Sequence, residues 1–159
     1  MAEMLGDVFH VCPLQYFAQE LSAAGHQVFV YVFSAKPSQS QWPEEQRPAL
    51  YEDLPFLFGA PFSEPGPTWE RLLSARMIDL LADFVHRGVL PTLDDGTAWP
   101  PYKHLRPAVV EIGSSGLRML ASGFRDGICR RLRPHLLGNR GRTASIAGCV
   151  RGNDPFRRE

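Results

Sequence analysis

The sequence has no long apolar run. Its longest purely apolar stretch, Val28–Phe33 (VFVYVF), is far below the roughly 20 residues that a membrane-spanning helix needs. The first residues, MAEMLGDVFHVCP, have neither a basic stretch nor an apolar core, so they do not read as a signal peptide. We therefore expect no transmembrane segment, and we expect any export signal to lie outside this chain.

The sequence also lacks the motifs that hold phosphates and metals. It contains neither a P-loop nor a dinucleotide fingerprint, and it has no Cys-x-x-Cys. No two histidines have the i, i+4 spacing of a helical metal site. We therefore expect no cofactor and no metal. The residues considered are Cys12, Cys129 and Cys149, and His10, His26, His86, His104 and His135.

A serine nucleophile of the hydrolase type is missing as well. The elbow Gly-x-Ser-x-Gly does not occur, and the nearest approach, Gly113-Ser-Ser-Gly116, is one residue too short. We interpret that segment as a plain hairpin turn. Adjacent carboxylates occur at Glu44-Glu45, Glu52-Asp53 and Asp94-Asp95, and because neighbours in a loop seldom converge on one substrate, we interpret all three as solvated turns.

Charge is absent overall but unevenly spread. The formal net charge is zero, yet residues 1–117 carry 7 basic and 14 acidic side chains, whereas residues 118–159 carry 10 Arg and 3 acidic ones. This basic end can either meet an anionic polymer or membrane or remain solvated without a partner. Aromatic residues lie mostly before residue 103, away from the arginines, so we expect no nucleic-acid platform. We predict a disordered tail over 138–159.

What the sequence does contain is enough apolar content, 44%, for one domain with a sizeable core. Cys12-Pro13 followed by apolar residues at helical spacing predicts a helix over 12–24, ending at Gly25. The apolar run 27–33 predicts a strand buried on both faces of a sheet. Residues 34–50 predict a long loop, which leads into the apolar segment 55–62.

The second half of the chain predicts three further elements. A stripe of apolar residues from Trp69 to Phe84 predicts a helix over 68–87, with Gly88 just past its end. Residues 108–112 and 116–120 predict a small hairpin, and 125–137 a third helix. Helices with a buried strand indicate an α/β fold. The strand 27–33 has no evident partner here, so we expect an incomplete sheet that docks on other polypeptide.

One ordered set of short motifs runs from residue 6 to residue 137, and in its order and spacing it resembles the C-terminal third of the cholinesterase/type-B carboxylesterase family. The motifs are Gly6-Asp7, Cys12-Pro13, Val28–Phe33, Trp42-Pro43-Glu44, Pro55–Phe62 (PFLFGAPF), Ser74–Met77 with Asp83-Phe84, Trp99–Tyr102 (WPPY), and Cys129 with Leu132–Leu137.

The resemblance implies that residues 1–137 form the C-terminal part of an α/β-hydrolase domain, with helices flanking a mostly parallel sheet. It implies ester hydrolysis by a Ser–His–acid triad whose serine, acid and Gly-rich oxyanion loop lie upstream of this segment. It also implies a disulfide between Cys12 and Cys129, an exported parent protein, and a Cys149 that is free or bonded to another chain.

The resemblance fails at Leu50. The family carries its triad histidine in a His-Gly-Asp-Glu or His-Gly-Tyr-Glu motif just before a Phe-Val-Phe-Gly segment. Counting back from Phe58-Gly59, Glu52-Asp53 takes the place of the acidic pair and Leu50-Tyr51 takes the place of His-Gly. Leucine cannot carry a proton, so we expect no catalytic residue in this chain.

These residues lead to the hypothesis of a non-catalytic C-terminal fragment or isoform of a cholinesterase-like protein, whose partner is the upstream part of the hydrolase domain. Two alternatives stay open. The parent is either an active carboxylic ester hydrolase, or a catalytically dead, neuroligin-like adhesion protein that binds an extracellular partner. A third is a truncated chain without a stable fold.

Overall fold

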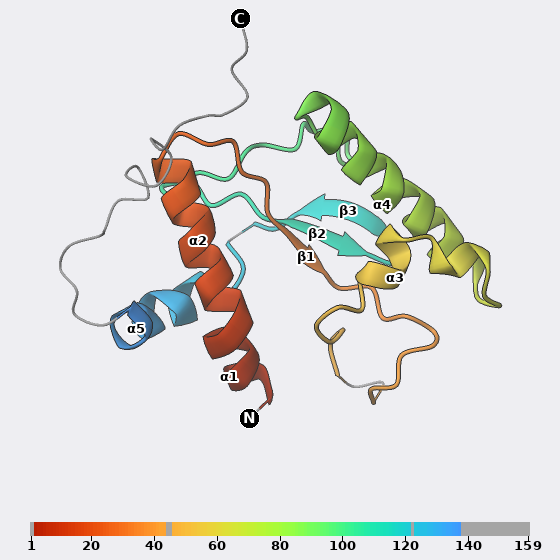
Figure 1. Ribbon diagram of the computed structural model, residues 1–159, viewed down its shortest axis with the longest axis horizontal. Coiled ribbons are helices and arrows are strands. Elements are labelled where there is room, and N and C mark those ends of the chain that lie inside the picture. The colour runs from red at the N-terminus through yellow and green to blue at the C-terminus, as the bar shows by residue number, and fades with distance from the viewer. Residues whose placement is uncertain (1, 44–45, 122, 138–159) are drawn as a thin grey trace, which may run out of the picture. The chain divides into compact units, whose positions relative to one another are not determined.

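The computed structural model describes residues 2–43, 46–121 and 123–137 (Figure 1). The expected tail 138–159, with Cys149, lies outside these residues. The chain forms two units, which are described separately. The first takes in residues 1–28, 101–107 and the chain from 123 onward, and the second takes in 29–100 and 108–122.

A three-stranded mixed sheet forms the centre of the second unit, in agreement with an α/β fold. Strands β1 (Tyr31–Phe33), β2 (Val110–Gly113) and β3 (Gly116–Met119) lie in that order. β1 runs parallel to β2, with Tyr31 opposite Val110, and β2 runs antiparallel to β3. The predicted hairpin is therefore confirmed. The expectation that the first strand has no partner within the chain is wrong, because β2 pairs with it.

The first strand is shorter and less buried than the sequence suggested. Only Tyr31–Phe33 belong to the ladder, and all three are half-buried. The residues before them stay outside the strand, although Val30 O still accepts the Val110 N–H at 3.1 Å. The core side chains of β2 point to one face of the sheet, and the opposite face carries the pair of Glu111 and Arg118. Burial on both faces was therefore a wrong expectation.

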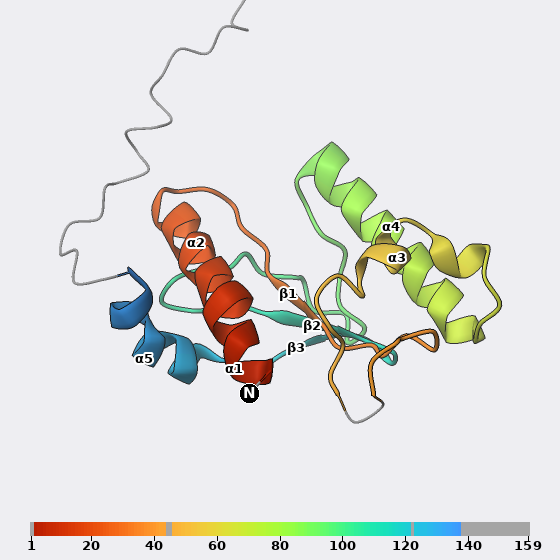
Figure 2. The same cartoon turned by 60° about the horizontal axis from the view of Figure 1, so that its bottom comes forward.

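Helices α3 (Leu54–Leu57) and α4 (Thr68–Arg87) lie on one side of the sheet (Figures 1 and 2). α4 has the predicted bounds, and Gly88, with φ of 66°, ends it in a left-handed conformation that favours glycine. The apolar segment 55–62 is helical, since a 3₁₀ turn at Ala60–Phe62 follows α3. The buried residues of this core are Ala35, Phe56, Leu73, Met77, Leu80, Leu93, Trp99, Val110, Ile112 and Leu117.

The first unit is helical. α2 (Cys12–Ala23) lies where the sequence predicted a helix, and α5 (Asp126–Leu137) packs beside it (Figures 1 and 2). Two elements ahead of α2 were not predicted: α1 (Ala2–Gly6) and a π-helix at Asp7–Val11. Among the described residues, no helix has the length and apolar character needed to cross a membrane.

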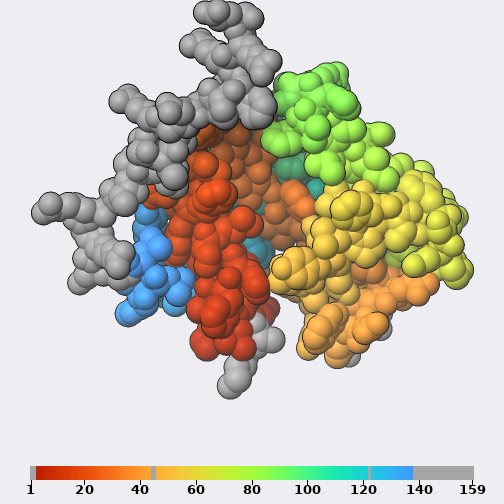
Figure 3. Space-filling view, viewed as in Figure 1, coloured from red at the N-terminus to blue at the C-terminus, as the bar shows by residue number. Residues whose placement is uncertain are grey.

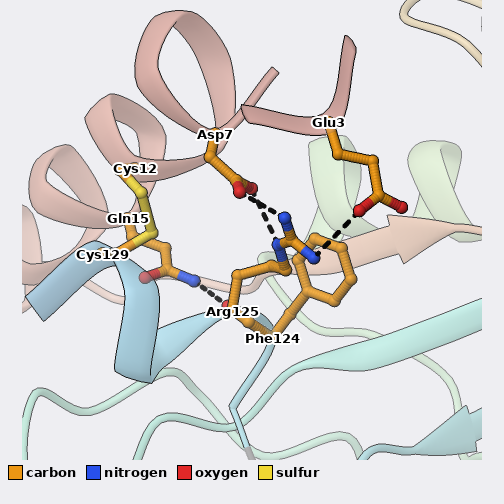
Figure 4. Close-up of polar contacts among 7 residues, drawn as sticks. All are labelled: Glu3, Asp7, Cys12, Gln15, Phe124, Arg125 and Cys129. Atoms are coloured by element: carbon orange, nitrogen blue, oxygen red, sulfur yellow. Dashed lines mark hydrogen bonds and ion pairs between the residues drawn. A yellow bond between two sulfur atoms is a disulfide. The ribbon is translucent and has the colours of Figure 1, made fainter. Parts of the chain in front are cut away.

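Two strong links join α5 and the residues before it to the N-terminal helices (Figure 4). Cys12 and Cys129 form a buried disulfide across 117 positions of sequence, which confirms the pairing that the resemblance implied. The guanidinium of Arg125 binds both carboxylate oxygens of Asp7, with Nε 2.8 Å from Oδ1. Gln15 adds a hydrogen bond to the carbonyl oxygen of Phe124. These contacts hold the first unit together.

Candidate functional site

The segment that carries Leu50 is a turn leading into α3. The Glu52 N–H donates to Ala49 O at 3.3 Å, and the Leu54 N–H donates to Tyr51 O at 3.1 Å. The Leu50 side chain is 52% exposed. The turn therefore presents a hydrocarbon side chain at the surface, where it contacts solvent rather than the core.

Tyr51 has an uncommon backbone conformation. Its φ is +73°, in the left-handed region that non-glycine residues rarely adopt. A side chain there costs about 1–2 kcal/mol relative to glycine, because Cβ approaches the following carbonyl oxygen. Its own side chain is exposed. The turn thus has the shape that a glycine would favour, although the residue in it is a tyrosine.

The carboxylates on either side of the turn are held by the chain itself. Glu52 accepts the Ala49 N–H at 2.7 Å, and Asp53 accepts the hydroxyl hydrogen of Tyr31 at 2.7 Å. Their interpretation as freely solvated groups is therefore wrong. A tight turn leaves backbone N–H groups within reach of nearby carboxylates, and a partly buried hydroxyl needs an acceptor.

The pair Asp94-Asp95 shows the same behaviour. Asp94 accepts the Leu117 N–H at 2.7 Å and pairs with Arg76, which ties its turn to β3 and α4. Hydrogen bonds from Thr97 lower the pKa of the exposed Asp95. The third predicted pair, Glu44-Glu45, lies outside the described residues.

Burial and the neighbouring Asp53 both raise the pKa of the Tyr31 hydroxyl above its usual value, burial being the larger cause. The hydroxyl is therefore a hydrogen-bond donor across the physiological range and not a proton acceptor. Its role in the site is to attach the turn to the sheet.

α3 is fixed against α4 and the sheet. The buried Ser74 hydroxyl donates to Phe56 O at 2.6 Å. The Phe56 ring lies 5.2 Å from that of Phe33 and 6.2 Å from that of Trp69, between centroids. Because α3 is held at several points, the turn directly ahead of it is held as well.

A cavity of about 280 Å³ adjoins this turn. In the space-filling view the segment from about residue 46 to residue 60 lies at the surface (Figure 3, orange-yellow to yellow). No histidine, cysteine, lysine or arginine is among the described residues that line the cavity. Its lining comprises Pro37, Gln39, Ser40, Gln41, Trp42, Leu50, Tyr51, Glu52, Pro55, Phe56, Ala60, Pro61, Glu64, Pro65 and Glu70.

The cavity includes a buried carboxylate that the sequence analysis did not single out. Glu70, on the first turn of α4, is only 5% exposed, and its Oε1 accepts the Ser38 N–H at 2.6 Å. The position of Glu70 on the core-facing stripe of a predicted helix was the one signal in the sequence that could have indicated this burial.

The other candidate groups do not form a site. Ser114 and Ser115 form the turn between β2 and β3, and both are exposed, which agrees with the hairpin interpretation. Over the described part of the chain, no three His, Cys, Asp or Glu side chains come close enough together to hold a metal ion. The turn at Leu50 and its cavity are thus the candidate site.

The chain shares most of its length with known proteins. The model of the carboxylesterase family matches residues 1–125. The chain is 33% identical over 135 residues to Acetylcholinesterase-1 of Trittame loki, covering 83% of this chain and 24% of that protein. It is 30% identical over 145 residues to an acetylcholinesterase of Gallus gallus, covering 87% and 19% respectively.

A third relative, an acetylcholinesterase of Bungarus fasciatus, is 29% identical over 131 residues, covering 80% of this chain and 21% of that protein. The chain thus spans about a fifth to a quarter of the length of these relatives. The matches confirm the resemblance read from the motifs, and the mixed sheet with its helices fits a portion of an α/β-hydrolase. The chain belongs to the carboxylesterase family.

Proposed function

We propose that this chain is a non-catalytic portion of a carboxylesterase-family protein, in which Leu50 stands where the family carries its triad histidine. Residues 1–137 are, in this proposal, the C-terminal part of one carboxylesterase type-B domain. Their binding partner is the upstream part of that domain.

The observation that carries the proposal is the composition of the site around Leu50. A triad needs a base within hydrogen-bond reach of the nucleophile. Leu50 has no group that can accept a proton, and all five histidines lie outside the lining of the adjacent cavity. Neither the turn nor the described lining beside it therefore offers a replacement for the missing base.

The backbone at Tyr51 supports the alignment on which the proposal depends. In the family motif the residue after the histidine is a glycine, and Tyr51 is the residue that takes its place. Its φ of +73° is a conformation that favours glycine. This agreement supports placing Leu50, rather than a neighbour, at the histidine position.

Two roles remain for the protein that contains this segment. One is ester hydrolysis, and the other is adhesion to an extracellular partner by a family member without catalytic activity. The distinguishing feature is the Gly-x-Ser-x-Gly elbow, which in the family lies ahead of the segment matched here. The Cys12–Cys129 disulfide supports an exported protein in both cases.

The first test is an ester hydrolysis assay on the full chain with a chromogenic short-chain ester. We expect no turnover above the rate in buffer. Turnover that an organophosphate abolishes would overturn the proposal, because it would require an active nucleophile and base.

A chimera isolates the contribution of Leu50. Residues 1–137 replace the matching segment of an active cholinesterase relative, once unchanged and once with Leu50→His. We expect the Leu50→His chimera to be faster by about 10⁴-fold or more, since losing the triad base removes most of the nucleophilic acceleration. Equal activity of the two chimeras, with both folded, would show that Leu50 does not stand at the base position.

A further inference from the structure

The cavity beside Leu50 has an unbalanced charge. Three of its lining residues, Glu52, Glu64 and Glu70, are acidic, and within the described lining no lysine, arginine or histidine offsets them. Negative groups gathered around a partly enclosed space raise the local concentration of cations, because low-dielectric walls focus the field. The cavity is therefore electrostatically suited to a cation.

Glu70 is the buried member of this set. Burying a carboxylate is costly unless hydrogen bonds and opposite charge compensate for the lost hydration. Its Oε1 accepts the Ser38 N–H at 2.6 Å, which leaves Oε2 for a further donor. The position is held tightly, since a Cβ at Gly66 would lie 2.8 Å from Oε2. The carboxylate is thus fixed at the cavity wall before any ligand arrives.

The rest of the wall is largely apolar and aromatic. Trp42, Tyr51 and Phe56 contribute rings, Pro55 and Pro61 contribute rigid apolar surface, and the cavity measures about 280 Å³. This space takes a group with a small aromatic or aliphatic body, and ring faces attract a cation placed over them.

We propose that this cavity binds an organic cation that carries N–H donors, a guanidinium or a primary ammonium, attached to a small apolar body. The donors matter because carboxylate oxygens are satisfied by charge-assisted hydrogen bonds, which a planar guanidinium delivers in pairs. A quaternary ammonium has the charge but no donor, so it leaves the Glu70 carboxylate unpaired. This proposal goes beyond the missing base and does not depend on whether the protein hydrolyses esters.

Calorimetric titration of the full chain with three related probes tests the chemistry of the site. Phenylguanidinium supplies charge and donors, phenylurea supplies donors without charge, and phenyltrimethylammonium supplies charge without donors. We expect phenylguanidinium to bind at least about tenfold more tightly than either of the others. Its affinity should fall as salt is added. Equal or tighter binding of phenylurea or phenyltrimethylammonium would overturn the proposal, and so would a lack of binding.

Charge-neutralising variants locate the site. Glu70→Gln keeps an oxygen for the Ser38 N–H but removes the charge, and Glu64→Gln does the same at the exposed edge. Each should weaken phenylguanidinium about threefold to tenfold. The matched control is Asp79→Asn, on the same helix as Glu70 but outside the lining, which should change affinity less than twofold. Equal effects of all three would mean that the probe responds only to net charge.

If Glu70→Gln does not fold, Glu64→Gln against Asp79→Asn still decides between a local site and a general charge effect. An arginine peptide, acetyl-Gly-Arg-Gly-amide, distinguishes the source of the cation. Binding of the peptide with the same dependence on Glu64 identifies a protein side chain as the ligand, and binding of phenylguanidinium alone identifies a small molecule.

Discussion

The hydroxyl of Tyr31, on β1, donates a 2.7 Å hydrogen bond to Oδ2 of Asp53, the residue directly ahead of α3. Asp53 makes no side-chain hydrogen bond to the N-terminus of α3, so this bond is its main contact. The bond attaches the turn that carries Leu50 to the central sheet.

Removing this bond should destabilise the second unit. Tyr31→Phe deletes the donor and leaves a partly buried carboxylate without it, which we expect to cost about 1–2 kcal/mol in the free energy of unfolding. Urea unfolding followed by circular dichroism measures the change. Tyr51→Phe, which removes an exposed hydroxyl from the same region, is the control and should change stability by less than about 0.5 kcal/mol. Equal values for the two variants would contradict the role of the bond.

The same residue predicts a dependence on alkaline pH. The pKa of Tyr31 is raised in the folded chain above its usual 10.0, first by burial and then by Asp53. The unfolded chain therefore loses this proton near pH 10, while the folded chain keeps it. Stability is fully present below pH 10 and falls as pH rises beyond it. In Tyr31→Phe the fall should be shallower, and parallel curves for the two proteins from pH 9 to 11 would disprove this.

The turn at Tyr51 should favour glycine over alanine. Both Tyr51→Gly and Tyr51→Ala remove the exposed ring, but only alanine keeps a Cβ in the left-handed conformation. We expect the glycine variant to be more stable than the alanine variant by about 1 kcal/mol, less any entropy that glycine gains in the unfolded chain. Thermal unfolding of the two variants provides the comparison. An alanine variant that is the more stable of the two would argue against this backbone geometry.

The disulfide should be a large contributor to stability. Cys12 and Cys129 close a loop of more than a hundred residues, for which the chain-entropy model gives about 4–5 kcal/mol. The double variant Cys12→Ser, Cys129→Ser should therefore unfold at much lower urea than the unaltered chain. A non-reducing peptide map checks the pairing directly, and free thiols at both positions in oxidised material would rule it out.

The ion pair of Asp7 and Arg125 should matter more than its neighbour. Asp7 is 4% exposed and binds Arg125 through both oxygens, whereas Glu3 is exposed and its Oε2 lies 3.7 Å from Arg125. Asp7→Asn should cost about 2–3 kcal/mol in unfolding free energy, and Glu3→Gln less than about 0.5 kcal/mol. Similar costs for both would indicate that burial does not strengthen the inner pair.

Local sequence was a good guide wherever an element is defined by its own residues. The stripe of apolar residues and Gly88 placed α4 correctly, because helical spacing and a left-handed end are properties of consecutive residues. The hairpin followed from two short apolar runs around a Gly-Ser-Ser-Gly turn. The segment 55–62 was harder, since an apolar run of this length suits a strand or a helix equally, and its packing onto α4 decided for a helix.

The sequence by itself determined the family, the disulfide partners implied by that family, and the presence of Leu50 where a base is expected. Each of these depends only on which residues follow one another. The tertiary structure alone decided that β1 pairs with β2 across some eighty residues, because no local signal encodes a distant partner. It also decided that Asp53 serves Tyr31, and that three carboxylates share one cavity, since only folding brings Glu52, Glu64 and Glu70 together.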